Sequence, residues 1–119
     1  MLERLSQSSG NILGYRILGK ITEEDYETLE EDISELVQQE DDIRLLLELD
    51  SYAGELVKVG GAKLKFRSEY RRFIPKMAIV GDKKWEAFLT SFIDPFYYDR
   101  ESKFFSNDES QAAWEWLKT

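Results

Sequence analysis

The chain has 119 residues and a net charge of −8, and it contains neither histidine nor cysteine. These absences exclude disulfides, zinc sites of the usual Cys/His kind, and Ser-His-Asp or Cys-His catalysis. The net charge argues against nucleic acid and anionic membranes as partners. No apolar stretch reaches the roughly 20 residues of a membrane span, and no secretory signal is expected at the start, so we expect a cytoplasmic protein.

Two apolar segments at the N-terminus predict a β-hairpin. Residues 2–5 and 11–18 flank Ser6–Asn11, a polar connection with a glycine suited to a turn. Within the second segment, Gly14 marks either a bulge or a place of close packing.

The next segment predicts an amphipathic helix. Thr22 and Asp25 form a weaker version of the capping box at its start. Five apolar residues at three- and four-residue steps make one buried stripe: Tyr26, Leu29, Ile33, Leu36 and Val37. Acidic residues occupy the remaining positions, and we interpret them as a solvated face in preference to a metal site.

Ile43–Asp50 is the most apolar run of the chain. Its length and its branched residues are typical of a strand that is buried on both faces, as in a parallel sheet. Turn-forming residues follow it, which favours a strand over a buried helix. In an open α/β sheet, the carboxyl end of such a strand is where a ligand or partner is met.

The second half of the chain repeats the alternation of helix and strand. Residues 62–73 predict a helix, and Gly60–Gly61 before it predict a break or a kink. Residues 77–80 predict a short buried strand. Asp82 is suited to cap the helix that follows, with Trp85 on its buried face.

Residues 101–105 predict the last strand. Ser106 and Glu109 then form a capping box that introduces a helix with Ala113, Trp116 and Leu117 on its apolar side. The order of elements predicts a single α/β domain over residues 1–119. It has a mainly parallel sheet of about five strands, an N-terminal hairpin and four helices. The strand exits near Lys20, Ser51, Asp82 and Asn107 are expected at one edge of the sheet.

Charge is spread unevenly along the chain. Residues 22–50 hold thirteen acidic groups against one arginine, and residues 55–76 hold seven basic groups against two glutamates. We interpret these as solvated helix faces that attract one another within the monomer, in preference to a basic docking patch.

Several segments along the chain carry a resemblance to a known family. The chain resembles the SpoIIAA-like family of the STAS superfamily, small bacterial α/β domains shaped like the anti-anti-sigma factors. The segments that carry the likeness are Asn11–Gly14, Leu45–Leu49, Leu64–Phe66, Ala78–Trp85 and Ala113–Leu117, and Val-Gly-Asp-Lys-Lys-Trp within them is the most specific.

This resemblance implies a non-enzymatic regulatory module that works by contact with a protein partner and needs no cofactor. In the better understood relatives, a serine at the exit of the corresponding strand is phosphorylated. Ser51 is therefore the phosphoacceptor candidate, although the motif here is Asp-Ser-Tyr-Ala-Gly instead of the Asp-Ser-Ser-Gly type. The structural alternative for Ser51 is a turn or helix-capping serine.

The candidate surface for a partner or ligand surrounds the strand exits. Its members are Lys20, Asp50, Tyr52, Gly81, Asp82, Lys83, Lys84 and Asn107. An anion could bind to free backbone N–H groups in the Gly81–Lys84 turn, or Asp82 could cap the helix while both lysines are solvated. No residues are placed for catalysis or for binding a metal, and a homodimer is compatible with the sequence.

A second functional class follows from aromatic residues in the last third of the chain: Phe92, Phe96, Tyr97, Tyr98, Phe104 and Phe105. The STAS fold resembles that of the CRAL-TRIO lipid carriers. These aromatics could therefore line a pocket for a small lipophilic or anionic ligand. The alternative is ordinary core packing, which is the more common use of such residues.

Overall fold

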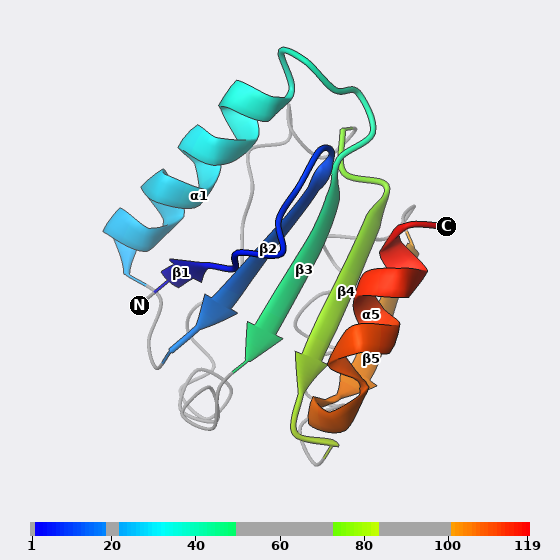
Figure 1. The fold of residues 1–119 in the computed structure, drawn as a ribbon. Coiled ribbons are helices and arrows are strands. Elements are labelled where there is room, and N and C mark those ends of the chain that lie inside the picture. Colours follow the sequence, from blue (N-terminus) through cyan, green and yellow to red (C-terminus); the bar gives the residue numbers. More distant parts are fainter. Residues whose placement is uncertain (1, 19–21, 50–72, 84–100) are drawn as a thin grey trace.

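The computed structural model describes residues 2–18, 22–49, 73–83 and 101–119 (Figure 1). In chain order the elements are β1 (Leu2–Arg4), β2 (Ile12–Ile17), α1 (Glu23–Leu36), β3 (Arg44–Leu49), β4 (Lys76–Gly81), β5 (Glu101–Ser106), the 3₁₀ helix η3 (Asn107–Glu109) and α5 (Ser110–Leu117).

The five strands form one mixed sheet in the order β1-β2-β3-β4-β5. β1 pairs with β2 in an antiparallel hairpin, and the other three pairings are parallel. β3 is the central strand, where Leu45 lies between Leu13 and Met77. The structure confirms a five-stranded sheet with the hairpin at one edge, and the sheet is mixed because one of its four pairings is antiparallel. Within the segment 43–50, which was predicted as an interior strand, residues 44–49 form the central strand, and Asp50 lies outside the described residues.

Two of the four predicted helices fall on described residues. α1 begins where predicted, and both hydrogen bonds of the Thr22–Asp25 capping box are present. The last helix was predicted to begin straight after Ser106. In the structure this helix begins later than predicted, because the Ser106–Glu109 capping box precedes a 3₁₀ turn and α5 itself begins at Ser110. The helix predicted over 62–73 and the helix predicted to follow Asp82 lie outside the described residues, apart from 73 and 83.

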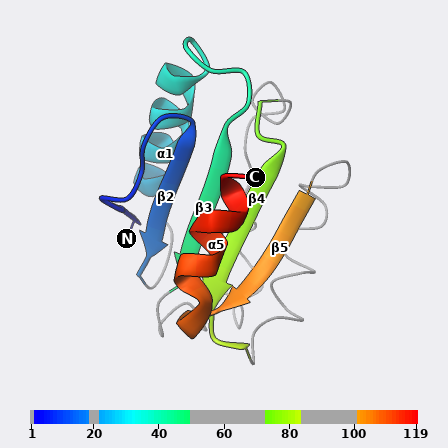
Figure 2. The ribbon, with the colours of Figure 1, turned by 45° about the vertical axis from the view of Figure 1, so that its right-hand side comes forward.

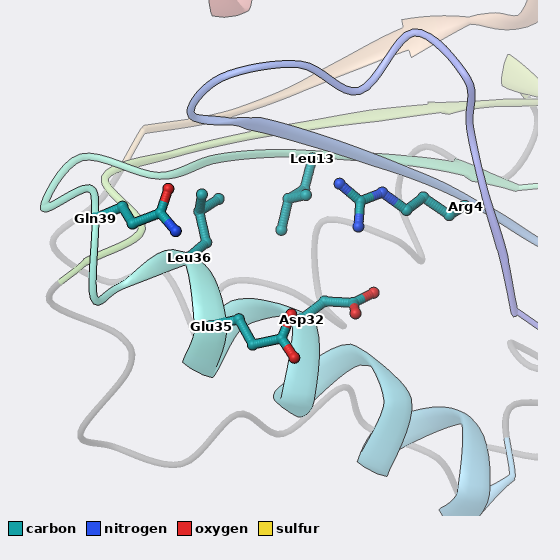
Figure 3. Close-up of a pocket in the computed structure, with 6 residues that line it drawn as sticks. All are labelled: Arg4, Leu13, Asp32, Glu35, Leu36 and Gln39. Carbon is teal, nitrogen blue, oxygen red and sulfur yellow. The ribbon is translucent and has the colours of Figure 1, made fainter.

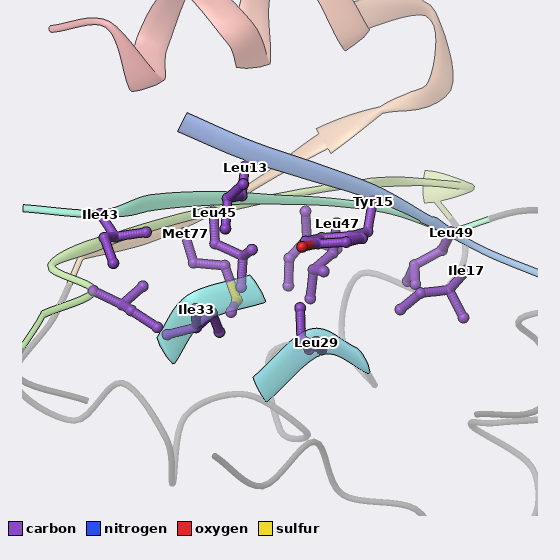
Figure 4. Packing of buried hydrophobic residues seen from close by; sticks show 12 residues of the cluster. Leu13, Tyr15, Ile17, Leu29, Ile33, Ile43, Leu45, Leu47, Leu49 and Met77 are labelled. Atoms are coloured by element: carbon purple, nitrogen blue, oxygen red, sulfur yellow. The ribbon is translucent and has the colours of Figure 1, made fainter. Parts of the chain in front are cut away.

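α1 covers one face of the sheet and α5 covers the opposite face (Figures 1 and 2). Apolar side chains form a separate cluster on each of these faces. The larger cluster packs the sheet against α1, through Leu29 and Ile33 of that helix (Figure 4). Its buried members from and around the sheet are Leu13, Tyr15, Ile17, Ile43, Leu45, Leu47, Leu49, Ile74, Met77 and Ile79. The smaller cluster packs the opposite face against α5, and it comprises Ile12, Leu46, Ala78, Val80, Phe105, Ala113, Trp114 and Leu117.

The smaller cluster corrects one prediction about α5. Trp114 is buried, with 3% of its surface exposed, whereas Trp116 is only partly buried and lies at the rim of the cluster. The six-membered ring of Trp114 covers Gly14 of β2, where a Cβ atom would overlap the ring. Gly14 is therefore a position of close packing, which settles the alternative left open by the sequence.

Candidate functional site at the carboxyl edge of the sheet

The four parallel strands end side by side at one edge of the sheet (Figure 1). Ile17 and Leu49 are register partners at the ends of β2 and β3, as are Gly81 and Ser106 at the ends of β4 and β5. Leu49 and Gly81 are neighbours as well, because a Cβ atom built on Gly81 would lie 3.5 Å from the Leu49 Cβ. The chain therefore leaves the core at four adjacent points, the arrangement in which open α/β sheets meet ligands and partners.

Four residues predicted for this surface lie in the described ranges. Gly81 is buried as the last residue of β4, Asp82 and Lys83 follow it, and Asn107 is exposed at the start of η3. The neighbours of a Cβ on Gly81 are at ordinary van der Waals distances, and its backbone conformation is open to other residues. Packing therefore leaves room for alanine here.

The other predicted members lie outside the described residues: Lys20, Asp50, Ser51, Tyr52 and Lys84. Asp50 directly follows Leu49, the last residue of the central strand.

Two carboxylates beside Lys83 were missed as members of this surface. The Ser106 hydroxyl contacts Asp108 and lies 2.7 Å from Glu109 Oε1, which also accepts a hydrogen bond from the Ser106 backbone N–H at 3.0 Å. The hydrogen bond with the Ser106 hydroxyl lowers the pKa of Asp108, and the positive charge of Lys83 contributes in the same direction.

The same two influences lower the pKa of Glu109, with the Ser106 hydroxyl first. The charge of Lys83 therefore acts on the pKa of both carboxylates, although Lys83 precedes them by more than twenty residues in the sequence. The sequence showed the Ser106–Glu109 capping box, but the approach of Lys83 depends on the parallel register of β4 and β5.

The carboxylates at this edge are charged groups under neutral conditions. Exposed carboxylates with lowered pKa values remain ionised at neutral pH, whereas a general acid needs a raised pKa. Among the described residues, no group of His, Cys, Asp or Glu side chains is arranged to hold a metal ion. The carboxyl edge thus presents charged groups of both signs.

The described aromatic residues do not assemble into one pocket. Phe104 and Phe105 are consecutive in β5, and they pack against different clusters on opposite faces of the sheet. Phe105 is a buried member of the smaller cluster, and Phe104 is partly buried against the larger one. The ring of Phe105 lies 5.9 Å from that of Trp116. Phe92, Phe96, Tyr97 and Tyr98 lie outside the described residues.

One small pocket does occur on the α1 side of the sheet (Figure 3). It has a volume of about 140 Å³ and is lined by Arg4, Leu13, Asp32, Glu35, Leu36 and Gln39. Sites for drug-sized ligands measure roughly 300–1,000 Å³ and are mostly apolar. This pocket is smaller and more charged, so it does not match the predicted carrier of lipophilic molecules.

Comparison with known proteins gives a family match and a structural match. A family model described as SpoIIAA-like matches residues 12–118. The chain is similar to a crystal structure of an uncharacterised protein with a SpoIIAA-like fold from Shewanella loihica PV-4. The TM-score is 0.64 at 21% identity, and the match covers 98% of this chain and 93% of that one. No curated protein matches the chain. In the described part of the chain, none of the helices has the length and apolar character to cross a membrane.

Proposed function

The chain belongs to the SpoIIAA-like family, and from this premise we propose that it is a non-enzymatic regulatory module which binds a protein partner through the carboxyl edge of its sheet. The observation that carries the proposal is the alignment of four parallel strand ends, which gathers distant segments on one surface. The fixed charges of Lys83, Asp108 and Glu109 on this surface support a contact with a polar, orienting rim.

The proposed switch within this surface is Ser51. It follows the central strand by two residues, so it would stand in the middle of the contact. A phosphate there would add close to two negative charges to an edge that already carries Asp108 and Glu109. Like-charge repulsion and desolvation would weaken the contact, which is the regulatory logic implied by the anti-anti-sigma resemblance.

The test uses the chain and matched variants as baits in affinity capture from the native host. The edge variants are Lys83→Glu and Ser51→Asp, and the control is Glu31→Lys on the exposed face of α1. A partner should be retained by wild type and by the control and be depleted by Lys83→Glu and Ser51→Asp. Circular dichroism of every bait checks that the fold is intact.

Isothermal titration with the captured partner then measures the switch. Ser51→Asp should weaken binding by about tenfold or more, since a fixed charge reproduces part of the phosphate effect, and Ser51→Ala should bind as wild type does. Equal affinities for wild type and Ser51→Asp would remove Ser51 as the switch. A loss seen only with charge reversal on α1 would move the interface to the acidic helix.

The carrier alternative remains a prediction and has its own readout. Native mass spectrometry of the chain purified from its host would show a co-purified small molecule as an added mass. A stoichiometric lipophilic ligand, together with no protein partner sensitive to the edge variants, would replace the interaction proposal.

A further inference from the structure

The pocket on the α1 side has walls of opposite charge (Figure 3). The hairpin contributes Arg4, whose guanidinium extends over the pocket, and α1 contributes Asp32 and Glu35 on the facing wall. In the described part of the chain, no ion pair joins Arg4 to either carboxylate. The cation and the two anions face a common space without neutralising one another.

A buried tyrosine holds one of these carboxylates in place. Tyr15 is 1% exposed, and its hydroxyl donates a hydrogen bond of 2.6 Å to Asp32 Oδ2. Burial raises the pKa of Tyr15, and the hydrogen bond and the charge of Asp32 raise it further, so the hydroxyl stays protonated in neutral solution. One oxygen of Asp32 is thereby committed to the core, and Oδ1 is left for a ligand.

Leu13 and Leu36 supply an apolar patch between the charged walls. The volume of about 140 Å³ is close to that of an engineered cavity of about 150 Å³ that accepts benzene. A ligand that fills this pocket is therefore about the size of benzene, with a positive end, a negative end and a short apolar part.

From this arrangement we infer that the pocket binds a small zwitterionic amino acid. The ligand carboxylate pairs with the Arg4 guanidinium, whose planar fork suits a carboxylate. The ammonium group lies between Asp32 and Glu35, and a short side chain packs on Leu13 and Leu36. The site lies toward the amino ends of the parallel strands, so it is separate from the proposed interaction edge and does not depend on it.

The test is an NMR titration of the isotopically labelled chain with L-alanine, ethylamine and propionate at constant ionic strength. Alanine carries both charges, and each of the other two carries one of them. Saturable shifts of the amides of Leu13, Asp32, Glu35 and Gln39 are expected with alanine, and much weaker effects with the other two. Tryptophan, which exceeds the pocket, should give no saturable shift.

Variants on each wall test whether alanine binds between Arg4 and the carboxylates of α1. Arg4→Gln and Glu35→Gln remove charges from exposed side chains, so the fold should persist while alanine affinity falls about tenfold. Glu31→Gln, on the same helix outside the pocket, and Arg16→Gln, which loses surface ion pairs with Glu3 and Glu48, should bind alanine unchanged. Binding of ethylamine as tight as that of alanine would overturn the proposal in favour of a simple cation site. The absence of saturable alanine binding, or equal losses in all four variants, would overturn it outright.

Discussion

The two helices that cover the sheet are attached to it in different ways. On one face, α1 packs through Leu29 and Ile33, and a hydrogen bond from Tyr15 to Asp32 links the helix to the sheet. On the other face, α5 inserts Trp114 over Gly14, where a side chain on β2 would collide with the ring. α1, which packs on the larger apolar cluster, is thus attached mainly by general apolar packing. α5, which packs on the smaller cluster, is attached by a specific fit between Trp114 and Gly14.

The end of α5 strengthens this contrast. The Nη1 of Arg44 donates a hydrogen bond of 2.6 Å to the Leu117 carbonyl, and Lys76 Nζ donates to the Trp116 carbonyl at 3.3 Å. Both cations come from the first residues of β3 and β4, and they meet the negative end of the helix dipole. α1 has no basic residue in its last turn. The fit of Trp114 and the two cations at its end therefore fix the position of α5 on the sheet. α1 is held mainly by apolar burial, and repulsion between its own acidic side chains opposes its stability.

Removing Trp114 should give the largest loss of stability. Trp114→Ala is expected to lower the free energy of unfolding by about 3–5 kcal/mol, because it empties the space between α5 and β2. Trp114→Phe should lose clearly less, since the indole N–H has no hydrogen-bond partner in the described part of the chain. Urea denaturation followed by circular dichroism measures both.

A double-mutant cycle sharpens this prediction. Gly14→Ala alone should destabilise the chain by about 1–3 kcal/mol through overlap with the ring. In the Trp114→Ala background the same change should have little effect, because the colliding atoms are gone. Additive losses would mean that Gly14 is needed for another reason.

Arg44→Met should give the next largest effect, about 1–2 kcal/mol of destabilisation. The substitution keeps the apolar stem and removes the donor to the Leu117 carbonyl, along with the 3.2 Å ion pair with Asp42. Arg16→Met is the control, because it removes only ion pairs of 3.9 and 3.6 Å with partly exposed partners and should change stability by less than about 0.5 kcal/mol. Equal effects would remove the special role of the α5 terminus.

The same contrast shows which features could be predicted from the sequence. The β3 run, the hairpin and the Thr22–Asp25 box are local patterns, and each was predicted correctly. The choice between Trp114 and Trp116 was missed, because both positions suit a stripe with Ala113 and Leu117, and the space over Gly14 decides between them.

The candidate site likewise has some features that the sequence predicts and others that depend on tertiary structure. Parallel topology was enough to place Gly81, Lys83 and Asn107 at one edge, since parallel strands end together. The influence of Lys83 on the pKa of Asp108 and Glu109 depends on strand register, and the charged pocket depends on how α1 meets the hairpin. Neither of these two arrangements can be predicted from the spacing of residues along the sequence.

Tyr15→Phe tests the polar link of the α1 face. We expect a loss of about 1 kcal/mol at neutral pH, because the variant keeps the ring and removes the hydrogen bond to Asp32. The pKa of Tyr15 is raised in the folded chain from its ordinary value of 10.0, by burial first and then by Asp32. Its contribution to stability is therefore complete below pH 10 and declines above it, where the unfolded chain releases the proton.

Tyr15→Phe should accordingly lose less stability than wild type when the pH rises above about 10. Thermal melts of both proteins at neutral and alkaline pH give the comparison. Parallel declines would show that other tyrosines cause the alkaline loss.

Glu31→Lys should give the smallest effect, with the opposite sign. Glu27, Glu31 and Glu35 are exposed and follow one another at intervals of one turn along α1, so their like charges oppose the helix. Reversing the middle charge turns two repulsions into two attractions and should raise stability by roughly 0.5–1 kcal/mol at low salt. The gain should shrink as salt is added, because a Debye length of about 10 Å at 0.1 M screens exposed charges.

Glu115→Lys on α5 is the matched control for that reversal. Glu115 pairs with Lys118 at 3.5 Å and accepts a hydrogen bond from Gln111 at 3.1 Å. Reversing this charge breaks favourable pairs, so stability should fall by a few tenths of a kcal/mol. Melting temperatures of both variants across a salt series show whether the two charge reversals change stability in opposite directions. If both reversals act in the same direction, the two helices do not differ in charge balance, and the contrast between the faces rests on Trp114 and Arg44 alone.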